Sequence, residues 1–227
     1  MNDDHAAAWR RIGADGGDIT LATASRACAA DLQADCLGVT LVVAGELRLM
    51  GHATDERARR LEDAQLTTGE GPCTDAYVRR ALVEEADLHQ AYARWPAFTQ
   101  AAAGQQMRSV TALPLTTGHL RLGAMDLYRT APGLLDDRHK RLARAYARIL
   151  ALLALDEHPR LLTAEHRPAL PGPQGYPPSV HLAAGVLAEI YRLAPDDALA
   201  RMRAHAFHHD QPLHQTADHV LTHRSLD

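Results

Sequence analysis

A segment crowded with proline, residues 158–178, sets the strongest limit on how this chain can fold. It contains six prolines and two glycines. Proline lacks a backbone N–H and fixes φ near −65°, so prolines at this density prevent regular secondary structure and favour extended backbone. We therefore predict two folded regions joined by a Pro-rich linker: a larger one before residue 158, and a smaller one over residues 179–227.

The larger region alternates between helical patterns and runs of β-branched residues. Two pairs of apolar runs, each joined by a short turn that contains glycine, predict two β-hairpins, 38–43 with 47–52 and 109–115 with 120–128. Helices are expected over residues 18–34, 55–65, 74–80, 95–105 and 134–156, and a short strand over 82–84. This order predicts an α+β fold for residues 18–157, with helices packed on an antiparallel sheet. Residues 1–17 are expected to form a polar leader.

The helix expected over residues 134–156 has apolar residues seven positions apart, at Leu135, Leu142 and Ile149. Tyr146 and Leu153 lie between them, so the pattern resembles a coiled-coil seam. Two interpretations remain open. The seam could join two copies of the chain in a homodimer, or the same face could pack on the sheet of its own domain.

Residues 179–227 predict a small all-α domain of three helices. Ser179 is a candidate N-cap for the first helix, Pro195 suits the first turn of the second, and the third follows Pro212. Each helix carries an apolar stripe at helical spacing, and many stripe positions are alanine, which allows close packing.

Composition limits the classes of protein to which the chain can belong. The 227 residues have a net charge of −4, and residues 179–227 hold four Arg against six Asp and Glu, a balance that counts against tight RNA binding. Three cysteines are too few for a disulfide framework. The N-terminus does not resemble a signal peptide, and the longest strongly apolar stretch is far shorter than a membrane span. We expect a cytoplasmic protein without a membrane partner.

The most distinctive local string is Gly69-Glu70-Gly71-Pro72-Cys73. In one interpretation the backbone amides, Glu70 and Cys73 line a small-ligand pocket, or Cys73 senses oxidation. In the other, which we favour, the string is a structural turn with a buried cysteine that caps the next helix.

Seven of the fourteen histidines lie in residues 179–227. His205 and His209 are four residues apart with His208 beside them, a spacing able to hold a metal ion. Because no cysteine or acidic residue follows at ligand spacing, we predict no metal site. No catalytic motif is recognisable in the sequence, so we predict no cofactor and no enzymatic activity.

The order of elements in residues 18–155 resembles a GAF domain, in particular those that precede ANTAR modules in actinobacterial regulators. The resemblance is carried by the first hairpin and by Leu61-x-x-x-Gln65-x-x-x-Gly69-Glu70-Gly71-Pro72-Cys73-x-x-Ala76, Asp87-Leu88, Trp95-Pro96, Val110-x-x-x-Pro114-Leu115 and Leu122-Gly123. It implies a sensor domain. The further motif residues of cyclic-nucleotide-binding GAF domains are missing, so no ligand is assigned.

Residues 179–227 resemble an ANTAR domain, a three-helix output module of bacterial regulators that bind nascent RNA. The matching pattern is Ala183-x-Gly185, Leu187, Asp197-Ala198, Met202-Arg203-x-x-Ala206 and Leu213-x-x-x-Ala217-x-x-Val220. Two positions depart from it: Leu182 stands where glutamine is frequent, and Ala184 where lysine is frequent. The resemblance implies that Ala183 and Gly185 serve close helix packing.

Together the two resemblances imply a transcription antiterminator, in which paired modules hold an RNA stem-loop of a nascent transcript under the control of the GAF-like sensor. Candidate RNA-binding residues are Arg192, Arg201, Arg203, His205, His208 and Arg224. At 100° per residue, Arg201 and Arg203 are expected to project into solvent on either side of Met202. The alternative is a non-enzymatic protein-interaction or dimerisation module that has lost RNA binding.

Overall fold

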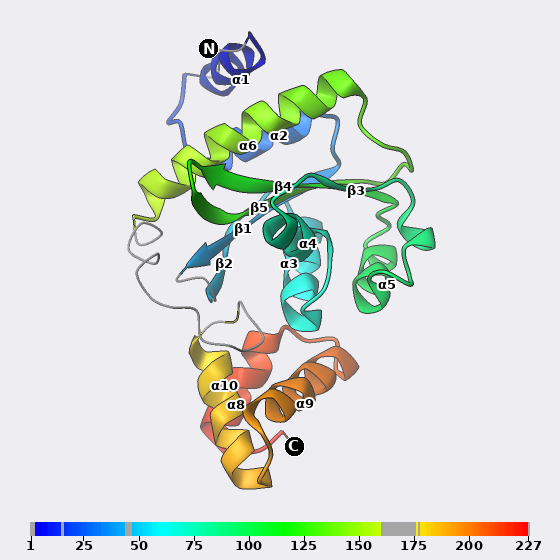
Figure 1. The fold of residues 1–227 in the computed structure, drawn as a ribbon, viewed down its shortest axis with the longest axis vertical. Coiled ribbons are helices and arrows are strands. Elements are labelled where there is room, and N and C mark those ends of the chain that lie inside the picture. Colours follow the sequence, from blue (N-terminus) through cyan, green and yellow to red (C-terminus); the bar gives the residue numbers. More distant parts are fainter. Residues whose placement is uncertain (1–2, 15, 44–46, 160–175, 177, 227) are drawn as a thin grey trace.

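A computed structural model describes residues 3–14, 16–43, 47–159, 176 and 178–226, with the backbone alone at 43, 47–49 and 178. Most of the linker predicted over residues 158–178 lies outside the described residues. The described part of the chain forms a sheet domain followed by a three-helix module (Figure 1). Among the described residues, no helix is both long and apolar enough to cross a membrane.

The sheet has five strands in the order β2-β1-β5-β4-β3, and all neighbours are antiparallel. Their bounds are β1 Cys36–Val43, β2 Leu47–Ala53, β3 Val83–Glu85, β4 Ser109–Thr117 and β5 Leu120–Arg129. Both predicted hairpins are present, and the pairing of β1 with β5 joins them at the centre, where Gly38 lies opposite Asp126. The expectation of an antiparallel sheet flanked by helices is confirmed.

Helices cover both faces of this sheet. Figure 1 shows α1, α2 and α6 on one side and α3, α4 and α5 on the other. Their bounds are α1 Asp3–Gly13, α2 Leu21–Asp31, α3 Glu56–Thr68, α4 Pro72–Arg79, α5 Pro96–Gly104 and α6 Asp137–Glu157, with a short 3₁₀ helix, η1, at Leu88–Gln90. Alternation along β5 divides the two cores: Met125 and Leu127 face the α6 side, whereas Ala124 and Tyr128 face the α3 side.

Two features of the α6 side differ from the sequence-based expectations. The leader expected over residues 1–17 contains helix α1, because Ala8 and Ile12, four residues apart, bury one face of it against the core. In α6, Tyr146 and Ile149 are fully buried within the same domain. The apolar seam of α6 therefore packs on its own sheet, and the interpretation of that seam as a dimer contact is wrong.

The C-terminal module consists of α8 Pro178–Tyr191, α9 Pro195–His208 and α10 Leu213–His223. Its core is rich in alanine, as expected, and Tyr176 joins it. Helix α8 already begins at Pro178, so Ser179 is not its N-cap. A Cβ added at Gly185 would meet no atom within 4 Å, so Gly185 does not serve close packing within the chain.

Candidate functional site

Five polar side chains form a buried cluster between the sheet and α3. Thr40 comes from β1, Glu62 and Gln65 from α3, and Asp126 and Tyr128 from β5. Glu62 is 4% exposed and Asp126 is fully buried. Carboxyl groups are seldom buried without partners, because an isolated charge in a protein interior is costly. The two buried carboxyl groups therefore need hydrogen-bond partners within this polar cluster.

The hydroxyl groups of Tyr128 and Thr40 both donate hydrogen bonds to Glu62. Thr40 Oγ1 donates to Glu62 Oε2 at 2.7 Å. Tyr128 Oη lies 2.9 Å from Glu62 Oε1 and 3.0 Å from Asp126 Oδ2, so its single proton stands between the two carboxyl groups. Both oxygens of Glu62 are thus engaged, and Tyr128 couples Glu62 to Asp126.

Gln65 links the polar cluster to the Gly69–Cys73 string through hydrogen bonds. Its Nε2 donates to Asp126 Oδ2 at 2.6 Å and lies 3.0 Å from Tyr128 Oη. Its Oε1 accepts a hydrogen bond from the backbone N–H of Cys73 at 2.8 Å. One amide thereby connects the carboxyl pair, Glu62 and Asp126, to the start of α4.

The surroundings favour the protonated form of Glu62. Burial, and then the neighbouring Asp126 carboxyl, raises the pKa of Glu62 well above its usual value. Burial, followed by Asp126 and Glu62, likewise raises the pKa of Tyr128. Two carboxyl groups this close do not both ionise readily, so the pair is suited to sharing a proton.

Two glycines make room for these side chains. A Cβ on Gly38 would lie 2.3 Å from Glu62 Oε1, and a Cβ on Gly71 would lie 2.3 Å from Gln65 Oε1. The φ of Gly71 is +136°, which side chains other than hydrogen rarely allow. The position of Gln65 therefore explains why residue 71, the second glycine of the Gly69–Cys73 string, has no side chain.

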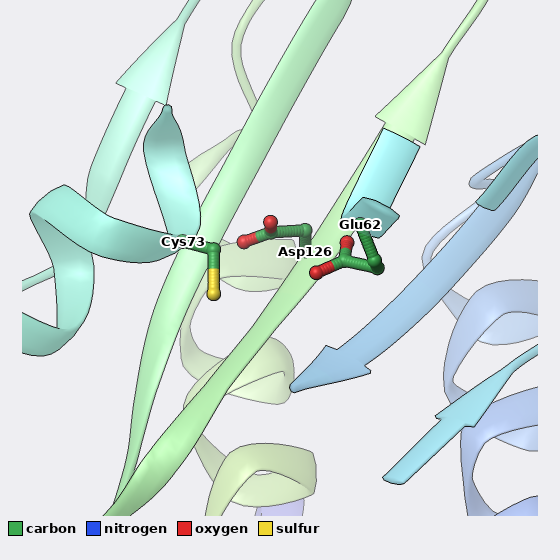
Figure 2. Close-up of side chains that lie close together, drawn as sticks. All are labelled: Glu62, Cys73 and Asp126. Carbon is green, nitrogen blue, oxygen red and sulfur yellow. The ribbon is translucent and has the colours of Figure 1, made fainter. Parts of the chain in front are cut away.

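The cluster also contains a set of atoms that could hold a metal ion. Sγ of Cys73 and one carboxylate oxygen each of Glu62 and Asp126 lie within 4.8 Å of one another. Figure 2 shows the side chain of Asp126 between those of Cys73, from α4, and Glu62, from α3. A thiolate with two carboxylates is a donor set that divalent transition metals accept.

Glu70 and Cys73, the predicted sensing residues, have different surroundings. Glu70 Oε1 accepts hydrogen bonds from the backbone N–H groups of Ala97 and Phe98, so it caps the N-terminus of α5. Cys73 is 3% exposed beside the carboxyl pair. Their roles in ligand or redox sensing remain predictions, but only Cys73 lies beside the polar cluster.

The predicted RNA-binding residues other than Arg203 lie on one side of α9 and at the ends of α8 and α10. Arg201, His205 and His208 share one side of α9, with Arg201 and His208 exposed and His205 half-buried. The guanidinium of Arg201 lies 5.2 Å from the ring centre of the exposed Tyr191. Arg192 and Arg224 are exposed at the ends of α8 and α10.

Arg203 departs from the expectation that it projects into solvent. Its Nε donates to the backbone carbonyl of Thr67, in the last turn of α3, at 3.0 Å. The helical pattern correctly placed Arg201 and Arg203 on either side of the buried Met202. It could not show that α3 occupies the space in front of Arg203.

Sequence reasoning missed the centre of the polar cluster, Glu62, Asp126 and Tyr128. One signal was available: Asp126 stands in the apolar run of β5 on the same face as Ala124 and Tyr128. A charged residue at a core position of a strand requires a buried partner. No local pattern, however, indicated that the partner would be Glu62 of α3.

Comparisons with known proteins agree with this architecture. The chain is similar to the GAF domain of a phosphoenolpyruvate-protein phosphotransferase from Acinetobacter, with 12% identity and a TM-score of 0.48 over 70% of this chain and 97% of the other. It is also similar to a GAF domain/HD domain protein from Geobacter sulfurreducens, with 14% identity and a TM-score of 0.46 over 63% and 97%. No protein-family model matches the sequence, and no curated protein does. At these TM-scores the GAF likeness describes the arrangement of helices and strands and carries no argument about ligands.

The same comparisons overturn the prediction that the chain is not an enzyme. Three similar structures are free methionine-R-sulfoxide reductases, at 14–16% identity. The one from Neisseria meningitidis, in complex with its substrate, has a TM-score of 0.47 over 72% of this chain and 95% of the other. The prediction rested on the lack of a local catalytic motif. A site assembled from separate helices and strands, as the polar cluster is, leaves no such motif in the sequence.

Proposed function

We propose that this protein is a transcription regulator whose three-helix module binds a stem-loop of nascent RNA under the control of the GAF-like sheet domain. The sequence resemblance of residues 179–227 to ANTAR domains suggests the class of partner. In this proposal the module acts as an antiterminator, because a stem-loop held by protein cannot rearrange into a terminator.

The observation that carries the proposal is an exposed strip of cationic and aromatic groups on the module. Tyr191 is 39% exposed with the guanidinium of Arg201 over its ring, and Arg192 follows it directly. His205 and His208 extend the strip along α9. Exposed rings and guanidinium groups stack on unpaired bases, and arginines contact phosphates. Figure 1 shows the turn between α8 and α9 at the end of the module away from the sheet, so the part of the strip next to this turn faces away from the sheet domain.

Acidic residues elsewhere in the module shape the expected binding. Residues 179–227 hold two more acidic than basic residues, so a general electrostatic attraction to RNA is weak. The local cations and the ring of Tyr191 must supply most of the affinity.

The proposal is tested by titrating the full chain with stem-loop RNA at two salt concentrations. We expect Arg201→Ala to weaken binding and to reduce the slope of log K against log salt by about one unit. Arg121→Ala is the matched control, because Arg121 lies 5.1 Å from the ring centre of Tyr77 in the sheet domain. Equal effects of the two substitutions, or no RNA binding at pH 6 and pH 7.5 at low salt, would contradict the proposal.

A second candidate function is protein interaction through α8. Leu182 is 63% exposed and Ile190 40%, and the exposed Gly185 lies between them. Exposed apolar side chains on one side of a helix are a feature of interaction surfaces, and here the exposed Glu189 lies on the same side. If the chain self-associates through α8, Leu182→Glu should lower the mass measured by sedimentation.

A further inference from the structure

The C-terminal module is held against the last turn of α3 through Thr67. The backbone carbonyl of Thr67 accepts a hydrogen bond from Arg203 Nε at 3.0 Å, and its Oγ1 accepts one from the backbone N–H of Leu213 at 3.2 Å. Thr67 is 6% exposed, and the neighbouring Leu66 packs against the apolar core of the module. One turn of one helix thereby binds both α9 and α10.

This contact suits the chemistry of a helix end. The last carbonyls of α3 have no partners within the helix and lie at the negative end of its dipole, where a guanidinium is favourable. Gly69 ends the helix with a φ of +71°, and a Cβ placed there would lie 3.0 Å from Arg203 Nη2 and 2.9 Å from Tyr176 Oη. The missing side chain of Gly69 lets Arg203 and Tyr176 approach the end of the helix.

The same helix reaches the buried polar cluster. Gln65 lies two residues and Glu62 five residues before Thr67 on α3, and the backbone N–H of Gly69 donates to the carbonyl of Gln65. A helix transmits a displacement along its length because its backbone hydrogen bonds hold it rigid. Any change in the cluster that shifts α3 therefore moves the carbonyl on which Arg203 is bound.

The contact between the module and α3 covers only the end of the helix, so the module can separate from α3 without disrupting the sheet domain. Beside it lies a cleft of about 1170 Å³ between α3 and α5 on one wall and α9 and α10 on the other. Phe207, 47% exposed, and His208 line this cleft from α9. The module thus rests on the end of α3 without closing over the rest of the helix.

We propose that the bond between Arg203 and Thr67 is the centre of an autoinhibitory contact, which keeps the α3-facing side of α9 away from RNA until α3 moves. This inference rests on the proposed RNA-binding function. Arg203 has two alternative partners, the end of α3 in the closed state and an RNA phosphate in the open state. RNA that needs Arg203 binds only to the open fraction, so its apparent affinity is reduced by that fraction.

Thr67→Val in the full chain weakens the docking of the module on α3 and leaves Arg203 available to RNA. It removes the hydroxyl that accepts from the backbone N–H of Leu213 and keeps the backbone carbonyl that Arg203 bonds. The backbone N–H of Leu213 then loses its acceptor, and a buried donor without an acceptor destabilises the contact. We expect faster hydrogen exchange over residues 213–216 and RNA affinity that rises about fivefold or more. Leu66→Ala weakens the same contact through packing and provides a second test should Thr67→Val fold poorly.

Two controls match this substitution. Thr67→Ser keeps the hydroxyl and should leave exchange and affinity unchanged. Thr68→Val removes the neighbouring hydroxyl, which donates to carbonyls within its own segment, and should not raise RNA affinity.

The outcomes separate this inference from the proposed function. Faster exchange together with tighter RNA binding supports the autoinhibitory contact. Faster exchange with unchanged affinity, when the wild-type chain binds RNA, overturns the contact as an inhibitor but leaves the RNA-binding function standing. If neither the wild type nor the released variants bind RNA, the proposed function fails, and the autoinhibitory role fails with it.

Discussion

The sheet domain buries carboxyl groups, whereas the module that follows it keeps its carboxyl groups, arginines and histidines at or near the surface. Glu62 and Asp126 lie inside the sheet domain. Among the described residues of the module, the buried polar side chain is Thr216, whose hydroxyl accepts a hydrogen bond from Gln211. The seven histidines of the module are half-buried or exposed.

This difference indicates which domain can respond to a signal through its own interior. A proton gained or lost by a buried carboxyl pair alters hydrogen bonds that position α3, β1 and β5. A proton gained by a surface histidine alters mainly the charge that a partner meets. Helix α3 takes part in both domains, because Glu62 faces the polar cluster and Thr67 holds the module.

The largest effect is expected from filling the space beside Glu62. Gly38→Ala would place a Cβ 2.3 Å from Glu62 Oε1, and Thr40 and Tyr128 hold that side chain in place. Overpacking of this kind typically costs about 1–3 kcal/mol. We expect thermal unfolding of the full chain to shift to lower temperature accordingly.

The module offers the matched control, Gly185→Ala. A Cβ at Gly185 meets nothing within 4 Å, and alanine is favoured over glycine within a helix by about 1 kcal/mol. This substitution should therefore stabilise the module slightly. If both substitutions prove neutral, the described packing around Glu62 is incorrect.

A smaller, pH-dependent effect is expected for Glu62→Gln. Because the folded-state pKa of Glu62 is raised, its contribution to stability is complete below the unfolded value of about 4.3 and is lost as the pH rises through the folded value. Glutamine does not titrate. The melting temperature of Glu62→Gln minus that of the wild type should therefore grow with pH, by a few degrees for each kcal/mol in a chain of this size.

Glu56→Gln supplies a control of opposite sign. Hydrogen bonds from Arg59 and Arg60 lower the pKa of the exposed Glu56 to about 2, so its small contribution is present above the unfolded value and is lost on acidification. A melting-temperature difference for Glu62→Gln that stays constant between pH 4 and pH 8 would show that the carboxyl pair does not share a proton as described.

The elements that sequence predicted well are those with local causes. The hairpins follow from alternating apolar runs around short turns, and Pro195 marks the start of α9. Helix α1 was missed because its buried face consists mainly of Ala8 and Ile12. The apolar spacing of α6 was ambiguous because a helix that packs on a sheet repeats its apolar residues much as a coiled coil does.

The functional features are non-local, and this explains why sequence did not predict them. The polar cluster needs three elements, β1, α3 and β5, that only the sheet order brings together. Likewise, helical geometry places Arg203 beside the apolar stripe of α9 but cannot name the neighbour it meets. That neighbour, Thr67, is 136 residues earlier in the chain.

Coupling between RNA binding and the contact of the module with α3 is tested most directly by hydrogen exchange of the wild-type chain with and without stem-loop RNA. Coupling between two sites is reciprocal, so if closure of the module on α3 opposes RNA binding, RNA must oppose closure by the same factor. We predict that saturating RNA speeds exchange over residues 66–69 and 213–216, while the strands of the sheet stay protected. RNA that binds tightly and leaves exchange at both segments unchanged would contradict the account.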